Sequence, residues 1–250
     1  HTSSDQIFTL DDAQRERLNP SYDGNYYVPD CPALRNSSLG AGVKRKEVEN
    51  AYFGSDPNLV VIDNFLSRDA LTKLRASCRE ATIWKDVKPG YLGTYLHDGF
   101  GQPLMLQIVY ELRKALPSIL RDHPLIEMWF YKCDQQLSGL DKHADCAAVN
   151  VNFWISPDEA NCEPETGGRE LFKAEAPLSW DFRRYNYDQE AIDAFLDEAD
   201  RESVTVPHRC NRAIIFISNL FHKTADCHFR SGYFNCRTNV TILFGHRYNR

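Results

Sequence analysis

The 250-residue sequence contains no long apolar run. None of its hydrophobic stretches approaches the roughly 18 residues that a membrane-spanning helix needs, so we expect no membrane partner. The first residues, 1–5 (HTSSD), lack the apolar segment of a secretory signal peptide. These two absences favour a cytoplasmic protein.

Cysteine pairs at metal-binding spacings are also missing. The eight cysteines include no CxxC pair and no zinc-ribbon spacing. Because eight is an even number, a disulfide framework is an alternative. However, eight thiols spread along 250 residues are far fewer than a disulfide-stapled scaffold contains. We therefore expect reduced thiols.

An excess of positive charge is absent. The formal net charge is −6 at pH 7, which disfavours a broad electrostatic contact with nucleic acid and favours a basic or neutral substrate. A glycine-rich stretch at residues 90–101 is not followed by the Gly-Lys-Ser/Thr of a phosphate-binding loop. We expect this stretch to be a structural loop or a flexible edge of a site.

The chain does contain a change of hydrophobic period. Helices are expected at residues 67–82, with Ser67 as the N-cap, and at residues 104–120. From residue 125 the period falls from 3.6 to 2. Strands are expected at residues 59–63, 126–133, 147–155, 170–173, 203–206, 213–218, 223–229 and 238–245. This order predicts an α+β, mainly β fold: a double-stranded β-helix (jelly-roll, cupin-like) core with supporting N-terminal helices.

Two segments fall outside the predicted core. Residues 1–58 are rich in Asn, Asp, Ser, Pro and Gly and have helical character only at 10–18. They predict an extended arm that packs on a domain of residues 59–250. Residues 174–202 form an insertion with an acidic helix whose apolar stripe is expected to dock on the core. We expect the arm, the 90–101 loop and the insertion to select the substrate. The oligomeric state is left open.

The residues best suited to chemistry begin at residues 142–145 (KHAD). In a strand, residues i and i+2 point the same way, so His143 and Asp145 can bind one metal ion. A third ligand must come from a distant strand, and His222 follows a buried run and a turn, as that role requires. Two histidines and one carboxylate leave three positions open on iron, enough for a bidentate cosubstrate and dioxygen.

Arg237 opens the apolar run at residues 238–244. An arginine buried in such a strand needs an anionic partner, which a cosubstrate carboxylate could supply through two parallel hydrogen bonds. The alternative is an edge-strand arginine that points to water. His228, nine residues before Arg237, competes with His222 as the distal ligand. We prefer His222 because it directly follows the strand and turn.

Residues 59–245 resemble the prolyl 4-hydroxylase-like group of 2-oxoglutarate- and Fe(II)-dependent dioxygenases. The segments that carry the resemblance are residues 58–66 (NLVVIDNFL), 142–145 (KHAD), 149–155 (VNVNFWI), 166–168 (TGG), 218–224 (SNLFHKT) and 237–241 (RTNVT). Each segment alone is a weak signal, and their combination is fairly specific.

The resemblance implies roles for individual residues. His143, Asp145 and His222 would bind Fe(II), and Arg237 would pair with the distal carboxylate of the cosubstrate 2-oxoglutarate. O2 would be the oxidant, succinate and CO2 the co-products, and ascorbate an added reductant. The carboxylate of Asp145 favours hydroxylation, because relatives that halogenate replace it with a small residue.

Three more residues are implied as cosubstrate contacts. Tyr131 stands where the family places an aromatic contact, Trp154 stands where relatives carry tyrosine, and Asn152 shares a strand face with Trp154. The implied activity is hydroxylation of a C–H bond in a small molecule or a protein side chain. Two alternatives remain: a cupin-like metal-binding protein, using zinc, without oxygenase activity, and a non-enzymatic interaction module whose acidic insertion binds a basic partner.

Overall fold

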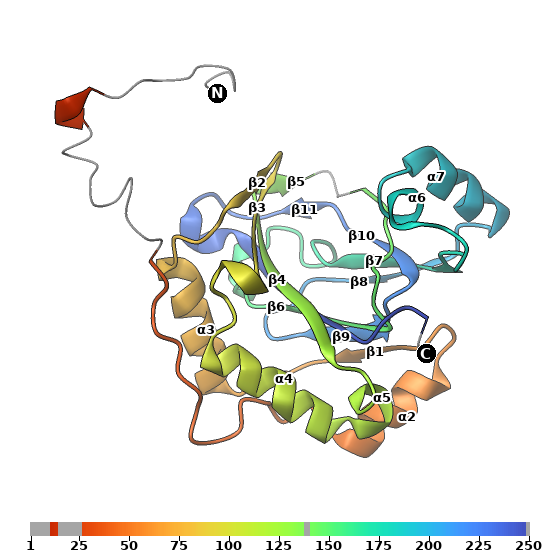
Figure 1. The fold of residues 1–250 in the computed structure, drawn as a ribbon, viewed down its shortest axis with the longest axis horizontal. Coiled ribbons are helices and arrows are strands. Elements are labelled where there is room, and N and C mark those ends of the chain that lie inside the picture. Colours follow the sequence, from red (N-terminus) through yellow and green to blue (C-terminus); the bar gives the residue numbers. More distant parts are fainter. Residues whose placement is uncertain (1–10, 15–26, 138–140, 249–250) are drawn as a thin grey trace.

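Two antiparallel sheets face each other in the computed structural model, which describes residues 11–14, 27–137 and 141–248 (Figure 1). The large sheet has seven strands in the order β1-β9-β6-β12-β4-β3-β2, and the small sheet has the order β10-β7-β8. The strands of the large sheet are β1 (Leu59–Ile62), β2 (Asp86–Lys88), β3 (Tyr91–Tyr95), β4 (Leu125–Cys133), β6 (Val149–Trp154), β9 (Ala213–Ile217) and β12 (Arg237–Phe244). Those outside it are β5 (Gln136–Leu137), β7 (Arg169–Glu175), β8 (Ser203–Val206), β10 (Leu220–Thr224) and β11 (Cys227–His228). This is the double-stranded β-helix that the sequence predicts.

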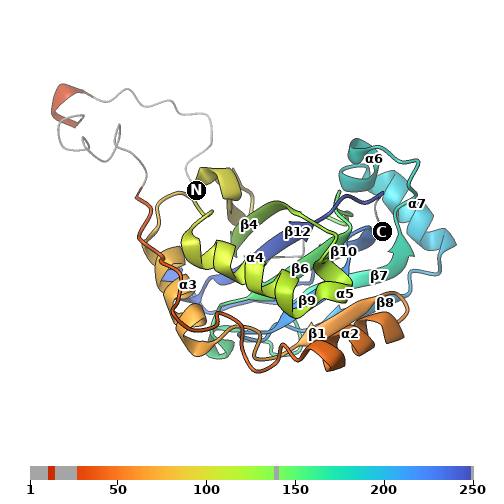
Figure 2. The same cartoon turned by 60° about the horizontal axis from the view of Figure 1, so that its bottom comes forward.

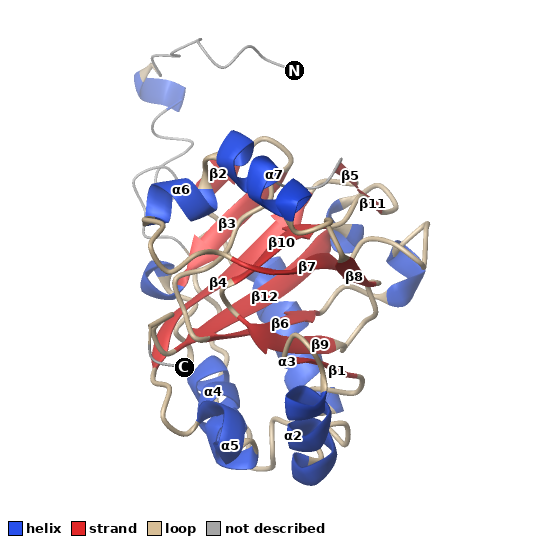
Figure 3. Ribbon diagram, turned by 90° about the vertical axis from the view of Figure 1, so that its right-hand side faces the viewer, coloured by secondary structure: helices blue, strands red, loops and turns tan. Residues whose placement is uncertain are grey.

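Helices cover the outer face of the large sheet (Figures 1 and 2). They are α2 (Arg45–Gly54), α3 (Arg68–Glu80), α4 (Pro103–Ala115) and α5 (Pro117–Leu120). Figure 3 shows α6 (Phe182–Asn186) and α7 (Gln189–Glu198) on the opposite side, beyond the small sheet. Short 3-10 turns are η1 (Leu96–Asp98), η2 (Asp158–Ala160) and η3 (Tyr233–Asn235). None of the helices in the described ranges combines the length and apolar character needed to cross a membrane.

The two faces of strand β6 show how the sequence divides the interior. Val151 and Phe153 join the main core beneath the helices. Trp154 packs between the two sheets, and alternation along the strand places Asn150 and Asn152 on the same inner face. The predicted division of β6 into an apolar face and a face with Asn150, Asn152 and Trp154 is confirmed.

Local sequence signals also explain where α3 and α4 begin and end. The Ser67 hydroxyl accepts a hydrogen bond from the backbone N–H of Ala70 at 3.3 Å, so the predicted N-cap is confirmed. The helix expected at 104–120 is interrupted at Leu116, because Pro117 cannot donate a backbone hydrogen bond and starts the separate helix α5.

The prediction of an extended arm is wrong for Arg45–Gly54, which forms helix α2. Its contact with the rest of the protein is narrow, since only Val48 and Tyr52, one turn apart, are buried. The helical character expected at residues 10–18 lies mostly outside the described residues. The assignment of 1–58 as a separate segment stays a prediction.

The prediction of a loop at residues 90–101 is also wrong, since this stretch contains strand β3 and turn η1. Gly90, with φ 84°, closes the β2–β3 hairpin in a conformation that favours glycine. Gly93 lies opposite Tyr131 in the neighbouring strand, where an added Cβ would be 3.0 Å from the tyrosine ring. Gly90 and Gly93 therefore belong to the β2–β3 hairpin and not to a loop.

All eight cysteines lie within the described residues, and no disulfide joins any two of them. Reduced thiols stay the expectation.

Candidate metal centre

Three side chains meet where the small sheet approaches the large one. His143 and Asp145 lie between β5 and β6, and His222 is on β10. His143 and His222 exchange two backbone hydrogen bonds, with N–O distances of 3.0 and 2.8 Å. Ligand atoms of the three side chains all lie within 4.8 Å of one another. The structure thus brings together the three predicted metal ligands.

Backbone carbonyls set the orientation of both imidazoles. Nδ1 of His143 lies 2.9 Å from the carbonyl oxygen of Asp141, and Nδ1 of His222 lies 2.8 Å from that of Leu220. Because a carbonyl can only accept, each Nδ1 carries the proton and each Nε2 keeps a free lone pair. Outer hydrogen bonds of this kind orient metal-binding histidines.

The protonation states also suit a cation. Burial, followed by the neighbouring His222, lowers the pKa of His143 to about 4, so the ring is neutral near pH 7. Burial alone would raise the pKa of Asp145, but the neighbouring His222, whose Nε2 lies 3.4 Å from Oδ2, followed by His143 and Arg169, holds it below its usual value. Asn150 donates to Oδ2 of Asp145 at 2.8 Å. An ionised Asp145 and a neutral His143 are the states in which these two side chains bind a metal.

The 174–202 insertion contacts the ligand segment directly. The backbone N–H of Ala144 donates to the carbonyl of Tyr185 at 3.0 Å, and Asn186 donates to the carbonyl of Ala144 at 3.0 Å. The Gln189 side chain binds both backbone groups of Lys142, at 3.1 and 2.8 Å. The insertion therefore holds the segment that carries His143 and Asp145.

The apolar stripe of α7 anchors the insertion. Ile192 and Leu196 are buried, and Phe195 packs against Phe221, with ring centroids 5.9 Å apart. The predicted docking stripe is confirmed. Since Phe221 precedes His222, this contact also supports the third ligand. Selection of the substrate by the insertion stays a prediction.

Arg237 is fully buried at the start of β12. It donates from Nε to the carbonyl of Gly167 at 2.5 Å, from Nη2 to that of Gly168 at 3.1 Å, and from Nη1 to Oδ1 of Asn239 at 2.8 Å. These acceptors are neutral, and no carboxylate of the described residues forms an ion pair with Arg237. The alternative of an arginine pointing to water is therefore wrong.

Gly168 has no room for a side chain, since an added Cβ would lie 1.8 Å from the carbonyl oxygen of Val206. We expect Gly168→Ala to lower the free energy of unfolding by about 3 kcal/mol, because the β7–β8 pairing must open. Urea unfolding followed by circular dichroism measures this loss. Gly54→Ala is the matched control, because nothing lies within 4 Å of its added Cβ. Equal losses in the two variants would contradict the prediction.

The other three predicted contacts lie on the inner face of the large sheet. The Tyr131 hydroxyl is 3.3 Å from that of Tyr95. Asn152 donates to Oγ1 of Thr241 at 2.6 Å, and its Oδ1 has no partner among the described residues. Nε1 of Trp154 is likewise buried without a partner there. The inner face therefore offers polar atoms that a ligand could satisfy.

His228 does not join the metal cluster. Its side chain is 45% exposed, and its Nδ1 lies 3.4 Å from Oε1 of Glu163. In the part of the chain that the structure describes, the cluster contains His222 instead. This geometry removes His228 as the competing ligand.

Arg169, at the start of β7, is a buried residue of the site that the sequence analysis did not identify. It is 5% exposed and pairs with Thr224, two residues after His222 on β10. The available signal was its alternation with the apolar Leu171, which places both residues on one strand face. The predicted strand began at residue 170, so it did not include Arg169.

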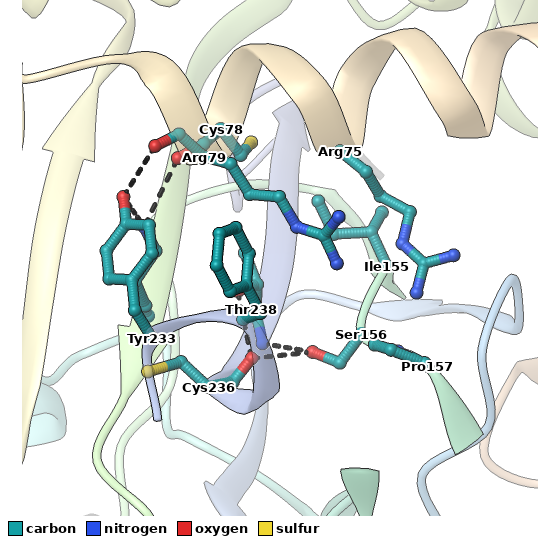
Figure 4. Close-up of a pocket in the computed structure, with 11 residues that line it drawn as sticks. Arg75, Cys78, Arg79, Ile155, Ser156, Pro157, Tyr233, Cys236 and Thr238 are labelled. Carbon is teal, nitrogen blue, oxygen red and sulfur yellow. Dashed lines mark hydrogen bonds between the residues drawn. The ribbon is translucent and has the colours of Figure 1, made fainter. Parts of the chain in front are cut away.

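A cavity away from the triad lies between α3, β4 and η3 (Figure 4). Arg75 and Arg79 of α3 line it together with Lys132 of β4. Lys132 donates to the Tyr233 hydroxyl at 2.7 Å and to the carbonyl of Cys78 at 3.2 Å, and Tyr233 donates to the carbonyl of Arg79 at 2.9 Å. These bonds tie η3 to α3, so Lys132 has a structural role here.

No family model matches the chain, and no curated protein matches it. Solved structures do match. The non-heme alpha-ketoglutarate-dependent carbocyclase SnoK from nogalamycin biosynthesis is 13% identical with a TM-score of 0.58, covering 86% of each chain. The fold is that of the non-heme 2-oxoglutarate-dependent oxygenases.

Two more structures of this oxygenase fold are similar. The epimerase SnoN, also from nogalamycin biosynthesis, is 13% identical with a TM-score of 0.57, covering 80% of this chain and 82% of its own. HygX from Streptomyces hygroscopicus is 13% identical with a TM-score of 0.53, covering 79% of this chain and 86% of its own. At these identities the similarity shows the fold and leaves the reaction to the site.

Proposed function

We propose that the protein is an Fe(II)- and 2-oxoglutarate-dependent oxygenase that hydroxylates a C–H bond of its substrate. The observation that carries this proposal is the arrangement of His143, Asp145 and His222, which direct two imidazole nitrogens and one carboxylate to a common point. This donor set suits Fe(II) and leaves positions for a cosubstrate and dioxygen. Structures of the same fold support it, since HygX was solved with nickel and 2-oxoglutarate and SnoN with Fe3+ and alpha-ketoglutarate.

The residues of the chain would divide the work as follows. Asp145 would supply the anionic ligand, and His143 and His222 would each supply an imidazole nitrogen. With Fe(II), 2-oxoglutarate and O2 bound, the centre supplies oxidative decarboxylation of the cosubstrate to succinate and CO2 and transfer of one oxygen atom to a C–H bond. The carboxylate of Asp145 occupies the position that a halide would need, which favours hydroxylation.

Arg237 is proposed to pair with the distal carboxylate of 2-oxoglutarate, because its buried charge has only neutral partners. Tyr131, Asn152 and Trp154 are proposed to contact the cosubstrate from the same face of the sheet. The polar atoms of Asn152 and Trp154 that lack partners support this. The substrate is proposed to be a small molecule or a protein side chain.

An anaerobic titration tests the proposal. Adding Fe(II) and then 2-oxoglutarate to the wild-type protein should produce a weak visible charge-transfer band, and admitting O2 with a substrate should release succinate. His222→Ala should abolish the band. His228→Ala is the matched control and should keep it, because His228 lies outside the cluster.

The same titration separates the alternatives. A wild-type protein that binds zinc but shows no band with Fe(II) and 2-oxoglutarate would overturn the oxygenase proposal in favour of a metal-binding protein. Once the band is present, succinate release screened over amino acids, peptides and small metabolites would identify the substrate class.

A further inference from the structure

Arg169 carries a buried positive charge that nothing in the described structure neutralises directly. Its Nε has no hydrogen-bond partner, and no carboxylate of the described residues forms an ion pair with its guanidinium. Burial, followed by the neighbouring Arg237, lowers its pKa to about 10, so it stays charged near pH 7. A buried charge without a partner is costly and therefore points to a ligand that supplies one.

The strand register directs this guanidinium toward the metal centre. Arg169 pairs with Thr224, and Leu171 pairs with His222. Directly paired residues share a face of the sheet, so Arg169 lies on the face that carries the ligand histidine, roughly 7 Å along the strand from it. Asp145 is the carboxylate that most favours the charged form of Arg169. The two side chains therefore interact electrostatically inside the site.

The surrounding polar atoms are donors that lack acceptors. Oδ1 of Asn239 accepts from Arg237, so the Nδ2 end of this amide is left as a buried donor without a partner. Trp154 lies directly opposite Asn239 in the β6–β12 pairing, and its Nε1–H is also without a partner. Arg237 links Asn239 and Trp154 to Arg169, because it also donates to the carbonyl of Gly168, the residue before Arg169. Buried donors without acceptors on neighbouring residues suit an acceptor-only group such as a carboxylate.

The charges in this region favour a further anion. Arg169 and Arg237 bring two positive charges and Asp145 brings one negative charge. If the proposed function is correct, Fe(II) adds two positive charges and 2-oxoglutarate two negative charges. One positive charge then remains inside the site, although the protein as a whole is acidic.

We propose that Arg169 binds a carboxylate in this site, with the free donors of Asn239 and Trp154 beside it. The proposal rests on the proposed function only for the identity of the ligand. Two sources of the carboxylate are consistent with the chemistry. One is the distal end of 2-oxoglutarate, which Arg169 would share with Arg237. The other is the second substrate, which would then be an anionic molecule, in contrast to the basic or neutral substrate that the net charge favours.

The first experiment uses metal-free protein, so it does not depend on turnover. Glutarate, a dicarboxylate without the keto group, is added to EDTA-treated protein, and the melting temperature is measured. We expect glutarate to raise the melting temperature of the wild type in a dose-dependent manner and to have no effect on Arg169→Leu. Without glutarate, Arg169→Leu should melt at the wild-type temperature or higher, because it removes an unpaired buried charge. Lys173→Leu, which removes an exposed cation of the same strand that pairs with Glu202, should keep the glutarate effect.

The second experiment separates the two sources. In the anaerobic Fe(II) protein, a rise of roughly tenfold or more in the Kd for 2-oxoglutarate in Arg169→Leu assigns the residue to the cosubstrate. If that Kd is unchanged, glutarate added to the Fe(II)–2-oxoglutarate complex should shift the visible band of the wild type and not that of the variant. This result assigns Arg169 to the second substrate.

Two results would overturn the inference. One is an Arg169→Leu variant that melts lower than the wild type and still responds to glutarate, which would make Arg169 structural. The other is an absence of any glutarate effect on the wild type in both experiments together with an unchanged Kd for 2-oxoglutarate. Failure of the proposed function looks different: the wild type would then show no band with Fe(II) and 2-oxoglutarate, while glutarate would still stabilise the metal-free protein through Arg169.

Discussion

Replacing Asp145 with alanine is expected to abolish 2-oxoglutarate turnover and to weaken Fe(II) binding by more than about 100-fold. Asp145 is 7% exposed and is the one carboxylate of the described cluster. Without it, two imidazole ligands remain, and neither offsets the positive charge of a divalent ion. Metal affinity measured by anaerobic titration, together with succinate release, checks this result.

Two variants of neighbouring residues make this prediction specific. Asn150→Ala removes the hydrogen bond to Oδ2 of Asp145, and outer hydrogen bonds of this kind typically contribute roughly 10- to 100-fold in metal affinity. Asp141→Ala is the matched control, because Asp141 is exposed and contacts His143 through its backbone carbonyl, which the substitution keeps. We expect the order Asp145→Ala, Asn150→Ala, Asp141→Ala from largest to smallest loss. An Asp145→Ala protein that still releases succinate at the wild-type rate would contradict the assignment of this ligand.

Much of the fold follows from local signals in the chain. The N-cap at Ser67 and the alternation along β6 depend on neighbours in sequence, and both were predictable. The placement of His222 after a buried run and a turn was predictable for the same reason, because β9 and β10 are consecutive strands. The resemblance to a known family added the roles of these residues and could not supply their distances.

The parts that were missed depend on long-range pairing. Helix α2 exposes most of its surface and buries only Val48 and Tyr52, so its amphipathic signal is weak. Gly93 of β3 looks like a loop residue until the strand is paired with β4, where Tyr131 fills the space above it. Arg169 looks like a surface residue until the β7–β10 register pairs it with Thr224, on the strand face that carries His222. Register between distant strands is a tertiary property, so local pattern alone could not place this arginine inside the site.

Arg237→Leu is expected to reduce the free energy of unfolding of the metal-free protein by about 3 kcal/mol, because it leaves the carbonyls of Gly167 and Gly168 and the amide oxygen of Asn239 buried without a donor. Arg237→Lys keeps the charge but replaces a planar fork by a single ammonium, which cannot reach three separated acceptors. We therefore expect a smaller loss of stability for the lysine variant and weak binding of 2-oxoglutarate by both. Urea unfolding and the anaerobic titration measure the two effects separately.

The other buried arginine gives this prediction its matched control. Arg169 and Arg237 are both nearly inaccessible to solvent, and the charge of Arg237 disfavours that of Arg169. They differ in hydrogen bonding, since Arg237 donates to three neutral acceptors while Nε of Arg169 has no partner among the described residues. The same Arg→Leu change should therefore destabilise the ligand-free protein at position 237 and leave it unchanged or more stable at position 169. Equal destabilisation at both positions would show that Arg169 contributes to the fold as Arg237 does, and a neutral result at both would show that the hydrogen bonds of Arg237 only offset the cost of burying its charge.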